Sequence, residues 1–257
     1  KENLCIDIDK AKEVITSKTK CLIHVSFNGR TNDLHKVKKF CRDNNIYLIE
    51  DAAQSLGSYY KGNHLGTIGD IGSLSFSSPK IITTGQGGAL LTNNEAIFKE
   101  IRKLKDFGRE SGGNDIHDSI GYNFKYTDMQ AVIGIEQMKK LKKRVIRKKE
   151  MYKLYYDGLK DVSDIEFIKT DLEATTPWFI DIFVEEPDKL AFYLKNNNIG
   201  TRRIYPPINT QKAYNVKGNF PVTEHCSSRG LWLPSSSKLT NEEIMEICTV
   251  IKKYYKK

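Results

Sequence analysis

Strand-like and helix-like segments alternate along the first half of the chain, and this alternation constrains the fold more than any other feature. Short apolar runs typical of strands lie at residues 21–27, 46–50, 73–77 and 88–92. Residues 33–45 and 95–108 instead place their apolar side chains on one face of a helix. Strands that alternate with helices predict a largely parallel sheet that is covered by helices on both faces.

The second half of the chain has a different pattern. A long helix begins near Thr127, where Thr127 and Gln130 form a capping-box pattern, and it runs into the basic stretch 139–149. A strand-like segment and two helix-like segments follow, at 177–184, 188–198 and from Thr240 onward. We therefore expect two domains, a sheet-based large domain over residues 1–140 and a linker helix with a small α+β domain over residues 141–257.

Composition excludes several classes of protein. The 257 residues are 39% hydrophobic, which suffices for a sizeable core, and no apolar run reaches the length of a membrane span. Five cysteines, an odd number without a CxxC pair, indicate free thiols in a reducing compartment. The five histidines show no spacing typical of a metal site. We expect a cytoplasmic protein without a membrane or metal partner.

The net charge of +9 comes from two short stretches of the chain. Residues 139–149 carry eight basic side chains and residues 252–257 carry four, while acids outnumber bases elsewhere. A solvated helix face and a charged chain end explain such runs. A nucleic-acid interface at 139–149 is the weaker alternative, because few aromatic side chains are interleaved with the charges. We therefore expect no nucleic-acid partner.

Residues able to do chemistry follow two of the predicted strands. In open α/β sheets, ligands bind beyond the carboxyl ends of the strands. Asp51 lies at such an end, with Gln54 three residues later, while Ser75 lies near the end of the next strand and Lys80 follows it. The stretch TTGQGG at 83–88 suits a phosphate, because small residues let backbone N–H groups approach an anion. Its spacing matches neither a P-loop nor GxGxxG.

An amine, an acid and an anion-binding turn together suit pyridoxal 5′-phosphate. Lys80 could condense with its aldehyde, Asp51 could keep its pyridine nitrogen protonated, and the turn could hold its phosphate. Taken singly, each feature also has a structural explanation: Asp51 could cap a helix, Lys80 could be solvated, and the glycines could form a hairpin turn. Spacing alone leaves both interpretations open.

A family resemblance extends over nearly the whole chain. Its most specific motifs are DAAQ, SFSSPK and TTGQGG, in this order and spacing. They resemble the DegT-type sugar aminotransferases, which are pyridoxal-phosphate enzymes of fold type I, and the likeness continues through GYNFKYTD and IGTRRIYPP. The resemblance implies an aspartate-aminotransferase-like α/β fold, in which residues 1–140 form the cofactor-binding large domain.

The resemblance also implies roles for individual residues. Lys80 matches the catalytic lysine, which binds the cofactor as a Schiff base and moves the substrate proton. Asp51 matches the acid on the pyridine nitrogen, Gln54 the residue near the ring oxygen, and Ser75 a serine on the phosphate. Asn123 matches an asparagine that reaches the phosphate in the neighbouring subunit's site. A homodimer with a shared active site is therefore expected.

The C-terminal part of the resemblance points to a substrate. The stretch with Arg202 and Tyr205 is most similar to members that act on 4-keto-6-deoxyhexoses, such as those leading to perosamine or viosamine. Arg202 is the expected contact for a substrate phosphate, with Tyr205 beside it. The implied reaction is transamination of a nucleotide-linked keto-6-deoxyhexose at C4 in amino-sugar biosynthesis, with glutamate as the donor. Dehydratase relatives carry histidine in place of the lysine, so Lys80 favours transamination.

The chain departs from the family at several positions. Lys125 replaces a usual arginine, Ser26 and Asn28 alter the stretch VHLYG of many members, and Asn209 replaces the histidine of YPxxH. Members usually carry roughly a hundred further residues upstream, including a helix N-terminus that binds the phosphate. The alternative to an active enzyme is therefore a truncated or degenerate member that folds and dimerises without catalysis.

Overall fold

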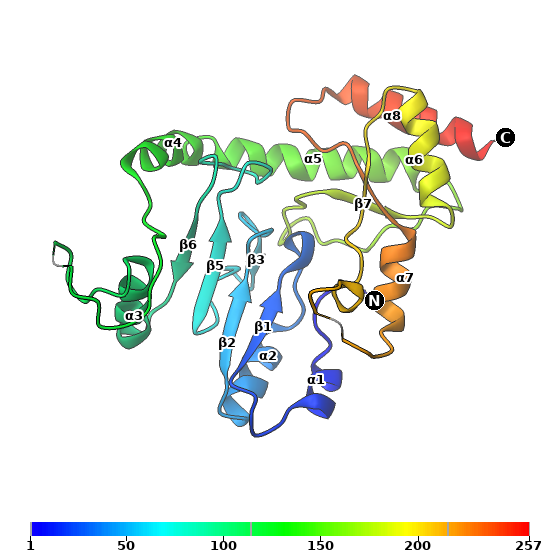
Figure 1. Ribbon diagram of the computed structural model, residues 1–257. Coiled ribbons are helices and arrows are strands. Elements are labelled where there is room, and N and C mark those ends of the chain that lie inside the picture. Colours follow the sequence, from blue (N-terminus) through cyan, green and yellow to red (C-terminus); the bar gives the residue numbers. More distant parts are fainter. Residues whose placement is uncertain (1, 114, 215, 257) are drawn as a thin grey trace. The chain divides into compact units, whose positions relative to one another are not determined.

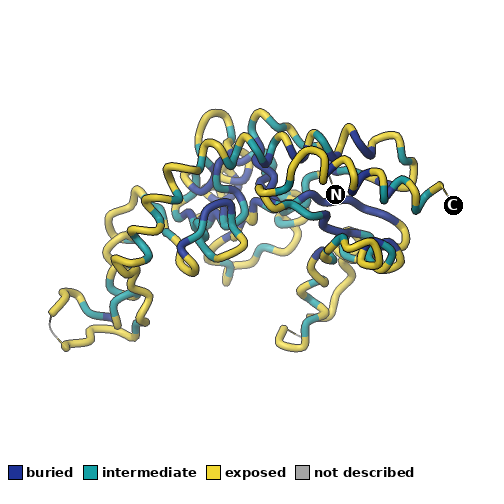
Figure 2. Tube along the Cα trace, turned by 90° about the horizontal axis from the view of Figure 1, so that it is seen from above, coloured by how far each residue is buried: buried dark blue, intermediate teal, exposed yellow. Residues whose placement is uncertain are grey.

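The computed structural model describes residues 2–113, 115–214 and 216–256 (Figure 1). The chain divides into two compact units. Cys5–Lys142 form the N-terminal unit, and Lys143–Lys257 with Lys1–Leu4 form the C-terminal unit. Each unit has a buried interior, which is dark blue in Figure 2. No helix among the described residues is long and apolar enough to span a membrane.

A four-stranded sheet organises the N-terminal unit. Its order is β1-β2-β5-β6, for strands Cys21–Val25, Tyr47–Asp51, Ile71–Ser75 and Gly88–Leu91 (Figure 1). The first three strands are parallel and β6 is antiparallel to β5. The other elements are α1 (Ile8–Val14), the 3-10 turn Phe27–Gly29, α2 (Leu34–Asp43), the hairpin β3–β4 (Tyr59–Tyr60, Asn63–His64), α3 (Glu95–Lys105) and α4 (Asp128–Met138).

Helix α2 covers one face of this sheet. Asp33 caps the helix by accepting from the backbone N–H groups of His35 and Lys36. The apolar side of the helix is buried against the sheet, as its periodicity predicts, through Leu34, Val37, Phe40 and Cys41. These side chains meet Leu22 of β1 and Leu48 of β2, so the core of the unit lies between α2 and the parallel strands.

The opposite face of the sheet is open. Ile23, Tyr47 and Leu90 lie on this face, and each is more than half exposed. The prediction that helices cover both faces is therefore wrong for this part of the chain. The reason is the connection from β2 to β5, which is the short hairpin β3–β4 and not a helix. Asp51 belongs to the same open face as Tyr47, because every second side chain of β2 points to the same side of the sheet.

Glu50 fixes the loop that leads into β5. It is fully buried, and its carboxylate accepts hydrogen bonds from the backbone N–H groups of Gly66, Ile68 and Gly69 at 2.6–2.9 Å. The loop passes so close to β5 that a Cβ at Gly72 would lie 1.7 Å from the carbonyl oxygen of Gly66. A buried carboxylate needs hydrogen-bond donors in place of water, and here three backbone N–H groups supply them.

The predicted long helix is two helices. The capping box of Thr127 and Gln130 is confirmed at the start of α4. However, α4 ends at Met138 and α5 spans Leu141–Leu159, with a turn at Lys139–Lys140 between them. Helix α4 has no buried residue, and its large apolar side chains are exposed.

The C-terminal unit is an α+β structure. Its three-stranded antiparallel sheet has the order β7-β9-β8 (Ile180–Phe183, Gly230–Leu233, Arg202–Arg203). Its helices are α5, α6 (Pro187–Asn196), the 3-10 turn Ile208–Thr210, α7 (Pro221–Arg229) and α8 (Asn241–Tyr255). Alternate strand residues such as Ile182 and Leu231 pack on Tyr155 of α5, Leu190 of α6 and Ile247 of α8.

The basic stretch 139–149 is partly structural. Arg147 donates to the carbonyl of Leu239, Lys149 to that of Glu173, and Lys148 to those of Trp178 and Ser235. Lys148 is buried, and burial lowers the pKa of its ammonium group to about 8. These three cations hold the chain of their own unit together, which weakens the nucleic-acid alternative.

Substitution Glu50→Gln is expected to lower the free energy of unfolding by about 2–4 kcal/mol, because an amide offers one acceptor oxygen and turns N–H groups toward backbone donors. Urea denaturation measures the loss. The control Glu100→Gln removes the same charge from an exposed position of α3 and should cost less than about 0.5 kcal/mol. Equal effects of the two substitutions would show that Glu50 does not hold the loop.

Candidate functional site

The candidate site lies at the carboxyl ends of the parallel strands. Asp51 ends β2 and Ser75 ends β5. Asp51 pairs with Val25 on one side and with Ser73 on the other, so all of these strand ends lie at one edge of the sheet. This is the edge where open α/β sheets bind their ligands.

The turn after β1 fixes Gln54. Asn28 adopts a left-handed conformation with φ of 53°, and its backbone N–H donates to Gln54 Oε1 at 2.8 Å. The hydroxyl of Ser55 donates to the carbonyl of Ser26, also at 2.8 Å. Two positions that depart from the family, 26 and 28, therefore hold the stretch that follows Asp51. An asparagine tolerates the left-handed region better than most residues.

A closed loop after β5 carries Lys80. Its base is held by Phe76, whose N–H donates to the carbonyl of Gly87 at 2.8 Å and whose carbonyl accepts from the N–H of Thr84 at 2.9 Å. The hydroxyl of Ser78 crosses the loop to the carbonyl of Gly85 at 2.9 Å. Gly87 has φ of 132°, a conformation that side chains rarely adopt, so the glycine-rich motif is needed to close this loop.

Lys80 is half-buried and is electrostatically coupled to Asp51. Burial lowers the pKa of its ammonium group to about 8, while the Asp51 carboxylate opposes that shift by favouring the charged form. At pH 7 about one Lys80 side chain in ten is then neutral, compared with about one in three thousand for an ordinary lysine. The structure therefore brings an amine with nucleophilic character next to an acid.

Ser75 adds hydroxyl groups to this edge. Ser75 Oγ lies 3.2 Å from Ser77 Oγ and accepts a long hydrogen bond from the N–H of Ser77. The donor set of Lys80, Asp51 and these hydroxyls fits the aldehyde, the ring nitrogen and the phosphate of pyridoxal phosphate. The N-terminal unit thus places Lys80 within electrostatic reach of Asp51, while Gln54 follows β2 and Ser75 ends β5 at the same edge of the sheet.

Asn123 lies elsewhere in the same unit. It is exposed and pairs as an isolated bridge with Asp106, just beyond α3. Lys125, two residues later, contacts Asp106 Oδ1 at 3.0 Å and lies 3.9 Å from the ring centroid of Phe107. The lysine that replaces the family's arginine therefore anchors this segment as an ion-pair and cation–π partner. The role of Asn123 in a neighbouring site stays a prediction.

The predicted substrate residues belong to the C-terminal unit. The guanidinium of Arg202 lies 5.5 Å from the ring of Tyr205 and 5.6 Å from that of Trp232. Tyr205 meets Trp232 edge-on at 4.9 Å, and Phe179 stacks on Trp232 at 4.3 Å. Asn209 lies nearby in sequence, in the turn Ile208–Thr210. Sequence reasoning missed Trp232, because only the register that sets it opposite Arg202 reveals their contact.

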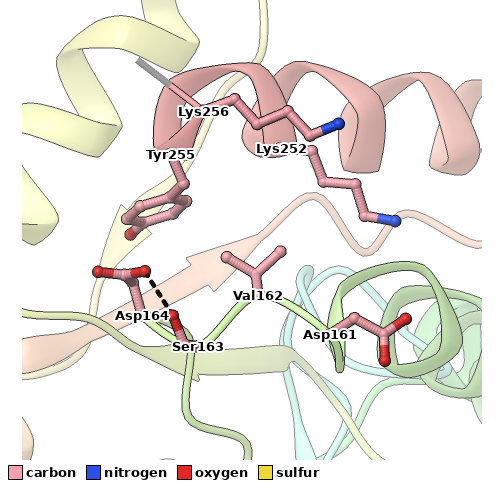
Figure 3. Close-up of a pocket in the computed structure, with 7 residues that line it drawn as sticks. All are labelled: Asp161, Val162, Ser163, Asp164, Lys252, Tyr255 and Lys256. Atoms are coloured by element: carbon pink, nitrogen blue, oxygen red, sulfur yellow. Dashed lines mark hydrogen bonds between the residues drawn. The ribbon is translucent and has the colours of Figure 1, made fainter.

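The C-terminal unit also has a cavity of about 370 Å³ (Figure 3). It is lined by Asp161, Val162, Ser163, Asp164, Lys252, Tyr255 and Lys256. Two carboxylates and two ammonium groups border it, and the hydroxyl of Ser163 donates to Asp164 Oδ2 at 3.0 Å. None of the predicted site residues lines this cavity, so it is distinct from the edge that carries Lys80.

Comparison with known proteins gives relatives in both sequence and structure. GDP-perosamine synthase of Escherichia coli O157:H7 is 32% identical over 254 residues, which cover 97% of this chain and 70% of that protein. The aminotransferase TlmJ from Streptoalloteichus hindustanus has a TM-score of 0.92 at 25% identity, covering 98% of this chain and 70% of that one. E. coli GDP-4-keto-6-deoxy-D-mannose-3-dehydratase with bound hydrated PLP has a TM-score of 0.85 at 22% identity. The match covers 97% of this chain and 72% of that one.

The family match covers nearly the whole chain. Residues 1–252 match the DegT/DnrJ/EryC1/StrS aminotransferase family. The match and the structural likeness confirm three predictions: the fold class, an aminotransferase as the enzyme class, and pyridoxal phosphate as the cofactor. This chain belongs to the DegT/DnrJ/EryC1/StrS aminotransferase family.

Proposed function

We propose that this protein transfers an amino group from glutamate to C4 of a nucleotide-linked keto-6-deoxyhexose, in amino-sugar biosynthesis. The observation that carries the proposal is the half-buried Lys80, coupled to Asp51 at the carboxyl edge of the sheet. The likeness to GDP-perosamine synthase supports a nucleotide-linked sugar as the substrate. The retained lysine supports transamination over dehydration.

Each residue of the site has its own proposed role. When bound, pyridoxal phosphate supplies an electron sink for the carbon that bears the transferred amino group. The amine of Lys80 would bind the cofactor and would carry a proton to and from that carbon. The negative charge of the Asp51 carboxylate would favour a proton on the ring nitrogen. Gln54, fixed by Asn28, would support the ring oxygen, and the hydroxyl of Ser75 would donate to the phosphate.

The two parts of the chain have different proposed tasks. Residues 1–140 form the cofactor-binding large domain, and residues 141–257 form the linker helix and the small domain. The guanidinium of Arg202 lies near the rings of Tyr205 and Trp232, and its N–H groups suit a substrate phosphate. Tyr205 presents an exposed ring beside it, suited to a nucleotide or sugar.

A second copy of the chain is the proposed partner. Helix α4 has no buried residue and exposes Met129 by 80%, together with Val132 and Ile135. A contiguous apolar face of this kind marks a protein interface. In such a homodimer, Asn123 of one copy would serve the site of the other. Because none of the five cysteines, all in the described part, forms a disulfide, we also propose that the dimer works in the cytoplasm.

The open face of the sheet supports an alternative. Ile23, Tyr47 and Leu90 leave apolar surface exposed to water on the face of the sheet that carries Asp51, and water in a cofactor site weakens its electrostatic interactions. The alternative function is that of a family member that folds and dimerises without catalysis. An amino-transfer assay with glutamate and a panel of nucleotide-linked keto sugars separates the two proposals.

Addition of pyridoxal phosphate is expected to give a near-visible absorption band from cofactor joined to Lys80, and Lys80→Ala should abolish that band. The expectation follows because the amine is the group of the site that condenses with the aldehyde. Lys99→Ala, which removes an exposed lysine of α3, is the matched control and should leave the band intact. An unchanged band in Lys80→Ala would refute the assignment.

The rate of cofactor attachment should rise with pH through about 8, since only the neutral amine attacks the aldehyde and burial lowers the pKa of Lys80 to about 8. Asp51→Asn removes the charge that favours the ammonium form. The midpoint of the rate profile should then move to lower pH. Stopped-flow absorbance across about pH 6–11, a range that brackets the shifted and the ordinary lysine pKa, gives both profiles. A midpoint near 10.5, the ordinary pKa of lysine, would contradict the burial argument.

Mixing two inactive variants should restore activity if the site is shared. Lys80→Ala and Asn123→Ala each damage every site of their own homodimer. A mixed dimer contains one intact site, so equal amounts should recover about a quarter of the wild-type activity after subunit exchange. Adding Val132→Asp to both variants, which charges the exposed face of α4, should abolish the recovery. Absence of recovery with intact dimers by sedimentation would show that Asn123 does not act across the interface.

A further inference from the structure

We infer that Gln130 is a positioning residue that holds the loop of Lys80 against helix α4. The inference deepens the proposed function and rests on the role proposed there for Lys80. Gln130 lies in the first turn of α4, and the loop spans residues 77–87. Its side chain contacts both elements within the N-terminal unit. In sequence it is separated from its partner in the loop, Gln86, by 44 residues.

The two ends of the Gln130 amide have different partners. Oε1 accepts from the backbone N–H and the hydroxyl of Thr127, each at 3.0 Å, which completes the capping box. Nε2 donates to the carbonyl of Gln86 at 2.9 Å. The N–H of Thr127 is only a donor and the Gln86 carbonyl is only an acceptor, so this orientation alone satisfies both. An amide is therefore required at position 130, and a carboxylate cannot replace it.

Neighbouring contacts press the loop against the same helix. The ring of Tyr126 packs on Gly87, where an added Cβ would lie 2.6 Å from Cε2. Gly134, one turn after Gln130, leaves room for Thr84, whose Cγ2 would lie 3.3 Å from a Cβ at position 134. Thr84 also donates to the carbonyl of Gln86 at 2.7 Å. The carbonyl of Gln86 is thus held from the loop side and from the helix side.

The tether acts on Lys80 through the closed loop. Gln86 adjoins Gly87, whose carbonyl accepts from the N–H of Phe76 at the base of the loop. A loop held at both positions keeps Lys80 half-buried beside Asp51, and burial is what lowers its pKa. Release of the tether would therefore let water reach Lys80. Because α4 also carries the exposed apolar face, Gln130 links the proposed interface helix to the reactive amine.

Substitution Gln130→Glu tests the tether with little change to the helix. A carboxylate still accepts from Thr127, so the capping box remains, but it has no donor for the carbonyl of Gln86. Hydrogen exchange of the full chain should speed up about tenfold at residues 83–88, the loss expected for one hydrogen bond. The midpoint pH of cofactor attachment should also move upward. Thr127→Ser keeps the hydroxyl that donates to Oε1, the capping box and the amide, and should change neither quantity.

The outcomes separate this inference from the proposed function. Unchanged exchange at residues 83–88 in Gln130→Glu would overturn the tether, whether or not the wild type binds pyridoxal phosphate. Faster exchange with an unmoved pH midpoint would show that Gln130 holds the loop but does not position Lys80, and would also overturn the inference. Protonation of the introduced carboxylate at low pH restores a donor, so protection of the loop should return there. This rescue keeps the test valid if the variant is less stable.

Discussion

The hydrogen bonds of the buried Glu50 carboxylate are the constraint on which the N-terminal unit depends. Three backbone N–H groups converge on this side chain, and they bring the loop at 66–69 beneath β2. That loop leads directly into β5, which pairs with β2. Because successive residues of a strand face opposite sides, the anchor on one face places Asp51 on the other. A single strand thus supplies both the attachment of its neighbour and the acid of the candidate site.

The reactivity of Lys80 results from two opposing electrostatic effects. Burial alone would push the amine toward its neutral form, whereas Asp51 stabilises the ammonium form. The balance leaves a group that is mostly protonated near neutrality and still has an appreciable neutral fraction. Both effects depend on where the loop holds the side chain. The backbone bonds of Phe76 and the amide of Gln130 therefore matter as much to the chemistry as the lysine itself.

Local periodicity predicted much of the fold. The buried side of α2, the strand ending at Asp51 and the capping box at Thr127 all appear as predicted, because each is a pattern among neighbouring residues. The antiparallel direction of β6 and the helix α7, which begins at a proline, were not predicted. Pairing direction depends on distant segments, and proline is also well suited to the first helical turn.

The candidate site was predictable in its residues but not in its supports. Asp51 and Lys80 stand at strand ends that the sequence reveals, and the family motifs gave them roles. By contrast, the bonds from Glu50, Asn28 and Gln130 join a side chain or an N–H group to a partner far along the chain. Such bonds leave no periodic signal. The capping box marked Gln130 as a helix start, and only the folded chain shows the second partner of its amide.

The N-terminal unit has a consequence for synthesis on the ribosome. It is one continuous stretch, Cys5–Lys142, with a core of its own, and domains fold as units in the order of their synthesis. The sheet and the lysine loop can therefore form while the C-terminal unit is still being added. At that moment α4 has emerged with its apolar side chains uncovered. Residues 128–138 are thus the segment where chaperone binding to the nascent chain is expected.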